Sequence, residues 1–327
     1  MFLGLGALML MQSCTKSPTE TVVQPVPVDD TTWATVDTIP KITDSLDKPV
    51  VVDSFNCAIS DDNANTINIG DSVTVNFPVG GCMTVNNDPN TIIKKSTKIR
   101  AEVRILASKG DLIRFHASTI SNSNIIAIGA FINIKLFYKG KEIFWNAAAP
   151  PIQVKIKAPN TTQILNYFSF QPSAPNSKDS TWLPNLSSIN YGLVVPYKDN
   201  QKRNWYQITS NRTRLFGCAY YIDKDNPKPQ TRLNVFLPLK YTNENTLVYA
   251  VLDKYKSVIR LKPNAQGKSY GTTGIPVNEA VTIVSISKIK GVYHLGIKPV
   301  TVADSKPITV LPNDTTKSEV NNFLKNL

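Results

Sequence analysis

The chain has 327 residues and a hydrophobic content of 42%, with 18% charged residues, so it is long and apolar enough to form a globular core. This composition excludes a chain that is disordered throughout, and 22 prolines and 15 glycines with many β-branched residues favour short strands over helices. The formal net charge is +12, and residues 14–50 are acidic, so residues 51–327 carry +15.

A basic body of this kind can favour nucleic acid, anionic lipid headgroups or acidic glycans. The lysines are scattered singly along the chain and form no dense cluster. A generally solvated surface therefore explains the charge without a polyanionic partner.

The N-terminus begins with a short apolar run, residues 2–11, which is followed by Gln12, Ser13 and Cys14. The run is too short to span a bilayer as a helix and has the length of a signal-peptide core. A small residue directly before a cysteine resembles a bacterial lipobox. The resemblance implies cleavage after residue 13 and lipidation of Cys14, with an unstructured apolar N-terminus as the alternative.

Residues 14–49 are rich in Thr, Pro and Asp and contain few large apolar side chains, of which Trp33 is the largest. Such a segment cannot bury enough surface to offset its ordering entropy. It is predicted to be a disordered tether. Thr31, Thr38 and Ser45 each follow an aspartate and resemble the Asp-Ser/Thr sites at which envelope proteins are O-glycosylated. After Cys14 no run approaches 18 apolar residues, so no transmembrane helix is predicted.

The first folded domain is predicted over residues 50–160, around two alternating strands. Ile99, Ala101, Val103 and Ile105 alternate with charged residues, and the run 132–138 repeats the pattern before the turn at Gly140. This period is that of strands with one buried and one solvated face. We expect the apolar side chains of both runs to face one core. Further strands are predicted at 73–77, 92–106 and 152–156.

The same region carries a family resemblance. The stretches 76–78, 100–106, 108–113 and 129–143 resemble a family of uncharacterised envelope lipoproteins of Bacteroidota-type bacteria, whose N-terminal part is similar to a ZU5-type β-sandwich. The resemblance continues weakly into 218–238 and 281–295. It implies a fold and a compartment, and it carries over no active-site residue.

A second β-rich domain is predicted over residues 161–315, with strands at 232–237, 246–251, 258–261, 280–286 and 292–297 and a hairpin turn at Lys290-Gly291. Residues 160–225 are the least regular part. Thr316 and Glu319 have capping-box spacing, so residues 316–327 are predicted to form a helix packed on the body. The overall prediction is an all-β protein with two antiparallel β-sandwich-like domains, a disordered tether and a short C-terminal helix.

An aromatic-rich region lies in the irregular stretch. Flat aromatic faces on loops can stack on sugars or peptides, and they can equally cover a domain junction. The candidate ligand-stacking residues are Trp182, Tyr191, Trp205, Tyr206 and Tyr220.

Cysteines and histidines give few chemical leads. Cys57 and Cys82 are the nearest cysteines for a disulfide, and each can equally be a buried free thiol. His294 alternates within a predicted strand and is expected on its surface, and His116 lies in a loop. Three cysteines without spaced histidines make no zinc site, and no metal or cofactor is predicted.

Two acidic stretches, 61–62 and 223–226, can be read as calcium ligands or as turns, and they lack EF-hand spacing. The sequence contains no nucleophile elbow, P-loop, HExxH or dinucleotide motif.

We therefore expect a non-catalytic binding or structural module, anchored by lipid in the cell envelope, most simply at the outer membrane. Its expected partners are the membrane and a glycan or another envelope protein, not nucleic acid. The first alternative is a glycan-binding accessory lipoprotein that uses the 182–221 region. The second alternative is an envelope hydrolase with a carboxylate pair assembled by folding.

Overall fold

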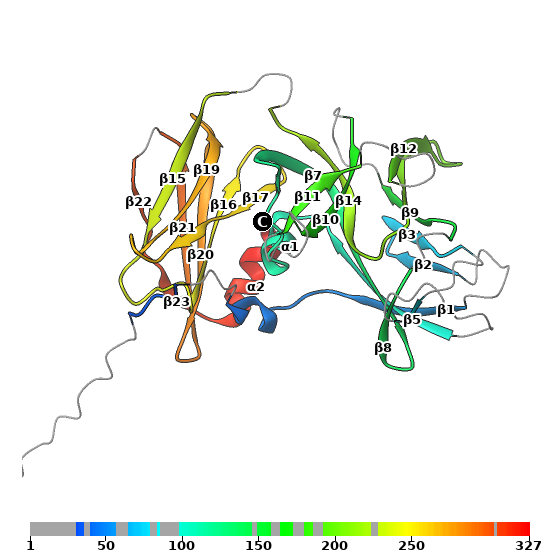
Figure 1. The fold of residues 1–327 in the computed structure, drawn as a ribbon, viewed down its shortest axis with the longest axis horizontal. Coiled ribbons are helices and arrows are strands. Elements are labelled where there is room, and N and C mark those ends of the chain that lie inside the picture. The colour runs from blue at the N-terminus through cyan, green and yellow to red at the C-terminus, as the bar shows by residue number, and fades with distance from the viewer. Residues whose placement is uncertain are drawn as a thin grey trace, which may run out of the picture. The chain divides into compact units, whose positions relative to one another are not determined.

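The computed structural model describes residues 31–35, 40–56, 65–78, 84–85, 98–145, 149–157, 164–172, 180–185, 192–223, 228–303 and 306–327. These residues are mostly strands in several sheets with largely antiparallel pairing, so the predicted all-β class is confirmed (Figure 1).

The first sandwich has a large and a small sheet. Strands of the large sheet run in the order β1-β5-β7-β14-β10-β11, and β4, β6 and β8 attach beside this path. Their bounds are β1 (Val51–Asn56), β4 (Thr84–Val85), β5 (Lys98–Leu106), β6 (Ile120–Ser121), β7 (Asn124–Tyr138), β8 (Lys141–Phe144), β10 (Asn166–Pro172), β11 (Ser180–Pro184) and β14 (Arg214–Tyr221). The small sheet has the order β12 (Leu193–Lys198), β13 (Asn204–Ser210), β9 (Ile152–Lys157), β3 (Val73–Asn76) and β2 (Thr66–Ile69).

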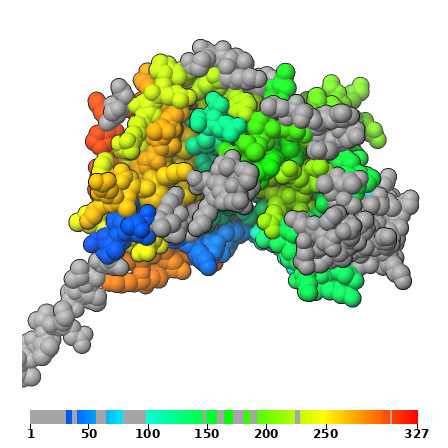
Figure 2. All heavy atoms as spheres, viewed as in Figure 1, coloured from blue at the N-terminus to red at the C-terminus, as the bar shows by residue number. Residues whose placement is uncertain are grey.

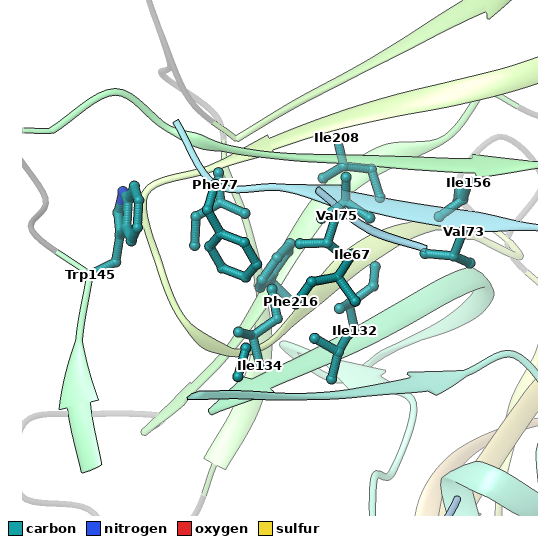
Figure 3. Close-up of a cluster of buried hydrophobic side chains, with 14 of the residues drawn as sticks. Ile67, Val73, Val75, Phe77, Ile132, Ile134, Trp145, Ile156, Ile208 and Phe216 are labelled. Carbon is teal, nitrogen blue, oxygen red and sulfur yellow. The ribbon is translucent and has the colours of Figure 1, made fainter. Parts of the chain in front are cut away.

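The core of this sandwich forms where the alternation of β5 and β7 predicts it. Ile132, Ile134 and Leu136 on β7 are completely buried, and they belong to one cluster with Val75 and Ile208 of the small sheet (Figure 3). Tyr138 packs partly buried against the same cluster. Side chains on one face of each sheet thus meet between the two sheets, as in a β-sandwich.

The turn between β7 and β8 also matches its prediction. Tyr138 pairs with Lys141, and the two residues between them, Lys139 and Gly140, have φ angles of 47° and 79°. Two successive positive φ values are typical of the tight hairpin turn that glycine favours. Lys290 and Gly291 form the same kind of turn between β20 and β21.

The predicted domain boundary at residue 160 is wrong. Strand β14 pairs with β7 from Arg214 to Tyr221, and β13 pairs with β9, so residues 166–221 complete the two sheets of the first sandwich. The region that we expected to be irregular therefore supplies five of its strands. The sheets divide instead between Tyr221 and Gln230.

The second sandwich is built from the residues that follow. Its outer sheet has the order β18 (Lys262–Asn264), β19 (Ser269–Pro276), β15 (Gln230–Phe236) and β22 (Ile308–Thr309). Its inner sheet has the order β17 (Ser257–Arg260), β16 (Thr246–Leu252), β20 (Ala280–Ile289), β21 (Val292–Thr301) and β23 (Asn313–Thr315). All five strands predicted here from the sequence are present, and β18, β19, β22 and β23 were not predicted.

The central strands of the inner sheet, β16 and β20, are largely buried on both faces. Every residue of β16 is buried, with Val248, Ala250 and Leu252 in the core between the two sheets. The alternate residues, including Tyr249, join a separate cluster with Phe131 of β7 and Trp182 of β11. This junction cluster connects the two sandwiches through apolar contacts.

Two α-helices of the described chain, α1 (Lys109–Arg114) and α2 (Lys317–Asn326), pack together in the junction cluster. Helix α2 begins with the predicted capping box, in which Thr316 and Glu319 satisfy each other's backbone N–H groups. Helix α1 begins with a second capping box, between Ser108 and Asp111, which was not predicted from the sequence. None of the helices in the described ranges has the length and hydropathy needed to cross a bilayer.

The described part of the predicted tether is ordered and packed. Residues 41–45 form the 3₁₀-helix η1 (Lys41–Ser45), and Ile42 and Leu46 are buried in the junction cluster. Upstream, Trp33 contacts Tyr270, with 5.1 Å between the ring centroids. The prediction of disorder is therefore wrong for these residues, because each of them finds an apolar partner far along the chain.

Candidate ligand-binding site

An open depression of about 500 Å³ lies on the outward face of the large sheet, over β1, β5 and the turn after β7. The apolar residues of these strands fill the core, so their alternate residues point outward. The lining residues are Val52, Asp53, Ser54, Lys98, Arg100, Phe137, Lys139 and Gly140. Strand β1 lies at the edge of the large sheet, and β5 lies between β1 and β7 (Figure 1).

Positive charge dominates the depression. Lys98, Arg100 and Lys139 supply three cations, and Asp53 is the one carboxylate in its lining. Asp53 accepts a hydrogen bond of 2.7 Å from the backbone N–H of Ser54, which occupies part of its acceptor capacity. The net charge of the lining therefore favours an anion.

Arg100 is held in place by its neighbours. It pairs across the strands with Phe137, and its guanidinium carbon lies 4.4 Å from the centroid of the Phe137 ring. The Nη1 of Arg100 also donates to Glu102 at 2.8 Å. A cation stacked on an aromatic face loses less freedom when it binds a ligand. Phe137 also offers an apolar surface beside the positive charges.

This arrangement suits recognition better than chemistry. Arginine and lysine can bind carboxylate, phosphate or sulfate groups, and an aromatic ring can contact the apolar part of the same molecule. The carboxylate pair that the hydrolase alternative requires is not part of this lining. Within the described ranges, no three His, Cys, Asp or Glu side chains gather to hold a metal ion.

The predicted aromatic binding region is mostly buried. Trp182 is completely buried, stacks on Phe131 at 3.6 Å between ring centroids and donates its indole N–H to the carbonyl of Ser118 at 2.8 Å. Its assignment as a ligand-stacking residue is wrong, because both its ring and its N–H serve the junction between the sandwiches. The alternative interpretation, that such residues cover a domain junction, is confirmed for Trp182.

The other candidate aromatics do not form a described binding platform either. Trp205 is buried and donates its indole N–H to Asp199 at 2.9 Å. Tyr206 and Tyr220 are partly buried against the core of the first sandwich. Tyr191 lies outside the described residues.

Cys14, Cys57 and Cys82 lie outside the described residues, so the predicted lipidation and disulfide stay predictions. Cys218 is a free thiol buried in the core of the first sandwich, and burial raises its pKa to about 12. Such a thiol behaves as a small hydrophobic side chain.

Both histidines lie in structural positions. His294 is buried on β21, with Nδ1 2.8 Å from a carboxylate oxygen of Asp314 and 3.3 Å from the hydroxyl of Tyr241, so its expected place on the strand surface is wrong. His116 follows α1 in a loop, as predicted, and contacts Thr43 and Tyr249.

The proposed modification and calcium positions are only partly described. Thr31 is exposed, Thr38 is outside the described residues, and the hydroxyl of Ser45 is hydrogen-bonded with Tyr293. Residues 61–62 and 224–226 are also outside the described residues, so the choice there between calcium ligands and turns stays open.

The depression itself was not among the sequence predictions. The alternation of β5 indicated that Lys98 and Arg100 face solvent, and this was the one signal in the sequence that pointed to the depression. Their convergence with Lys139 depends on the pairing of β5 with β7, which the sequence does not reveal. Comparison of the chain with protein-family models and with curated proteins gave no match.

Proposed function

We propose that this protein is a non-catalytic binding module of the cell envelope, anchored by lipid at Cys14, that binds an anionic ligand in the depression of its first sandwich. The observation that carries the proposal is the lining, which contains three cations, Lys98, Arg100 and Lys139, with Phe137 and a single carboxylate, Asp53. The apolar run before Cys14 supports the anchor.

The ligand class follows from these side chains. A flexible lysine binds a charged group as a point charge, whereas the guanidinium of Arg100 can bind carboxylate, phosphate or sulfate in a bidentate manner. The depression is open, so it suits one unit of a longer chain better than an enclosed small molecule. An acidic glycan of the envelope carries anionic groups and is a long chain, so it meets both requirements.

The anchor is tested by membrane fractionation of the native protein against Cys14→Ala, with a high-salt wash that releases peripherally bound protein. We expect Cys14→Ala to leave the membrane fraction, because stable anchoring needs the acyl chains. If both proteins partition into the membrane equally, Cys14 is not the anchor.

The ligand site is tested with heparin as an anionic glycan and dextran as a neutral one, by isothermal titration calorimetry. The variant Lys98→Glu/Lys139→Glu reverses two lining charges. The control Lys306→Glu/Lys325→Glu changes the net charge equally at exposed positions of the second sandwich and α2. We expect heparin affinity to fall about tenfold or more in the first variant only, since each lost charge contact is worth about 1 kcal/mol.

Equal losses in both variants would show that heparin responds to net charge alone, and the proposed site would be wrong. Binding of dextran as strong as that of heparin would contradict the anionic specificity.

A further inference from the structure

Three large apolar side chains are exposed at one end of the outer sheet of the second sandwich. Phe236 ends β15, Leu239 follows in the next turn, and Leu311 follows β22, with exposed fractions of 37%, 62% and 68%. Scattered apolar residues on a surface need no explanation, whereas neighbouring ones often mark a contact with a protein or membrane.

Hydrogen bonds place the segments that carry these three side chains next to one another. The N–H of Val310 donates to the carbonyl of Phe236 at 3.0 Å, and the hydroxyl of Tyr241 donates to the carbonyl of Pro312 at 3.1 Å. Val310 is buried in the core, so Leu311, one residue further, points outward. The three exposed side chains therefore belong to adjoining segments at one end of the outer sheet.

Two lysines border the same surface. The Nζ of Lys298 donates to the carbonyl of Thr309 at 2.8 Å, beside the strand pair formed by Phe236 and Thr309. Lys240 is the neighbour of Leu239 in the turn. Two acids lie in the same part of the fold: Glu244, which is exposed, and Asp314, which lies 2.8 Å from His294.

The start of the described chain is attached next to this surface. The side chain of Asn243 forms two hydrogen bonds with the backbone of Ala34, of 2.9 and 2.8 Å. Figure 2 shows the segment 31–35 in dark blue against the yellow residues of the second sandwich. The segment between Cys14 and Thr31 spans at most about 60 Å when fully extended. A lipid at Cys14 would keep this part of the protein within that distance of a bilayer.

We propose that Phe236, Leu239 and Leu311, with Lys240 and Lys298, form a docking surface for a bilayer that contains anionic headgroups. Apolar side chains at the tip of a domain can enter the interface of a bilayer, and adjacent lysines are attracted to its negative surface. A second copy of the chain fits less well, because it would bring the same lysines against one another. The inference rests on the proposed lipid anchor for its orientation.

The surface is tested by cosedimentation of the full chain carrying Cys14→Ala, which removes the acyl chains, with phosphatidylcholine vesicles with or without phosphatidylglycerol. Leu239→Ser/Leu311→Ser removes two exposed apolar side chains. The control Ile164→Ser/Val195→Ser removes two others, exposed by 82% and 50%, from the first sandwich. We expect the partition coefficient for mixed vesicles to fall about tenfold in the first variant and to stay unchanged in the control.

A third variant, Lys240→Glu/Lys298→Glu, should lose binding to vesicles with phosphatidylglycerol and respond little to those without it. Thermal melts of all variants are the check that each is folded. The proposal is overturned if the parent chain does not bind mixed vesicles, or if Leu239→Ser/Leu311→Ser binds as the control does. It is also overturned if that variant instead abolishes a dimer seen by sedimentation velocity without lipid.

These outcomes are separate from the fate of the proposed function. Membrane fractionation of Cys14→Ala tests the anchor, and heparin titration tests the depression. Vesicle binding by the unlipidated chain tests the docking surface alone.

Discussion

The imidazole Nε2 of His116 lies 2.6 Å from the hydroxyl oxygen of Thr43. This contact connects the end of α1 to η1, which lies in the segment before the first sandwich. Its Nδ1 lies 3.0 Å from the hydroxyl of Tyr249 on β16. One histidine thus joins three parts of the chain. The neutral ring suits this position, because one nitrogen can donate while the other accepts.

The first prediction is a loss of stability in mild acid. Burial, assisted by Lys48 and Arg260, lowers the pKa of His116 to about 4 in the folded state from 6.5, whereas nearby Asp44 acts in the opposite direction. Between these two values the unfolded chain binds more protons. The contribution of His116 is therefore fully present above about pH 6.5 and is lost as the pH falls towards 4, by up to about 3 kcal/mol.

His116→Asn is the variant that tests this effect. Asparagine tolerates the positive φ of 53° at this position and does not titrate. Urea unfolding of both proteins between about pH 7 and pH 4 should show a smaller decline in the free energy of unfolding for the variant. Identical declines would assign the acid sensitivity to other groups.

The second prediction concerns the two faces of β7. Ile134→Asp places a charge without a partner in the core of the first sandwich, where Ile134 contacts no water, and should cost several kcal/mol (Figure 3). Lys135→Asp, on the other face and opposite Glu102, should cost less than about 1 kcal/mol. Thermal melts compare them, and a larger loss for Lys135→Asp would reverse the assigned faces.

Local patterns predicted local structure well. The alternation of β5 and β7 gave their buried faces, and Lys139-Gly140 and Lys290-Gly291 gave two hairpin turns, because each signal lies within a few neighbouring residues. The capping box of Thr316 and Glu319 gave the start of α2 in the same way. That of Ser108 and Asp111 was overlooked, since Gly110 makes the stretch resemble a loop.

Features that depend on distant partners were not predictable in this way. The boundary at residue 160 was wrong because β14 pairs with β7. The sequence of neither strand indicates which other strand it pairs with. Trp182 was assigned to a ligand because its stacking partner, Phe131, is far away in the sequence. The depression escaped prediction for the same reason, since Arg100 and Lys139 meet only after β5 and β7 have paired.

The third prediction concerns the close approach of α1 and α2. A Cβ atom at Gly110 would overlap the backbone oxygen of Leu324, and backbone cannot move aside as a side-chain tip can. Gly110→Ala should therefore destabilise the protein by about 1–3 kcal/mol. The three heavy atoms nearest to a Cβ at Gly267 belong to the side chains of Asn264 and Ser269, so Gly267→Ala should change stability by less than about 0.5 kcal/mol. Urea unfolding measures the loss of stability in both variants, and equal losses would contradict the packing of α1 on α2.

The fourth prediction separates the proposed O-glycosylation sites. The hydroxyl of Ser45 is bonded with Tyr293 and the carbonyl of Ile42, whereas Thr31 is exposed. We expect peptide mapping of the native protein to find hexoses at Thr31 or Thr38 and an unmodified Ser45. A sugar on Ser45 would show that modification precedes the docking of η1, and an intact mass without hexoses would remove the hypothesis.

The pairing of β7 with β14 has a consequence for how the protein is made. Residues 126–134 of β7, at the centre of the large sheet, have no strand partner on one side until Arg214–Tyr221 has been synthesised, although β5 and β8 are available long before. Loop closure over such a separation slows folding, and an unpaired strand edge invites pairing with another chain. During synthesis the nascent chain therefore passes through a stage in which β7 is exposed, and a chaperone that covers this edge would raise the yield of folded protein.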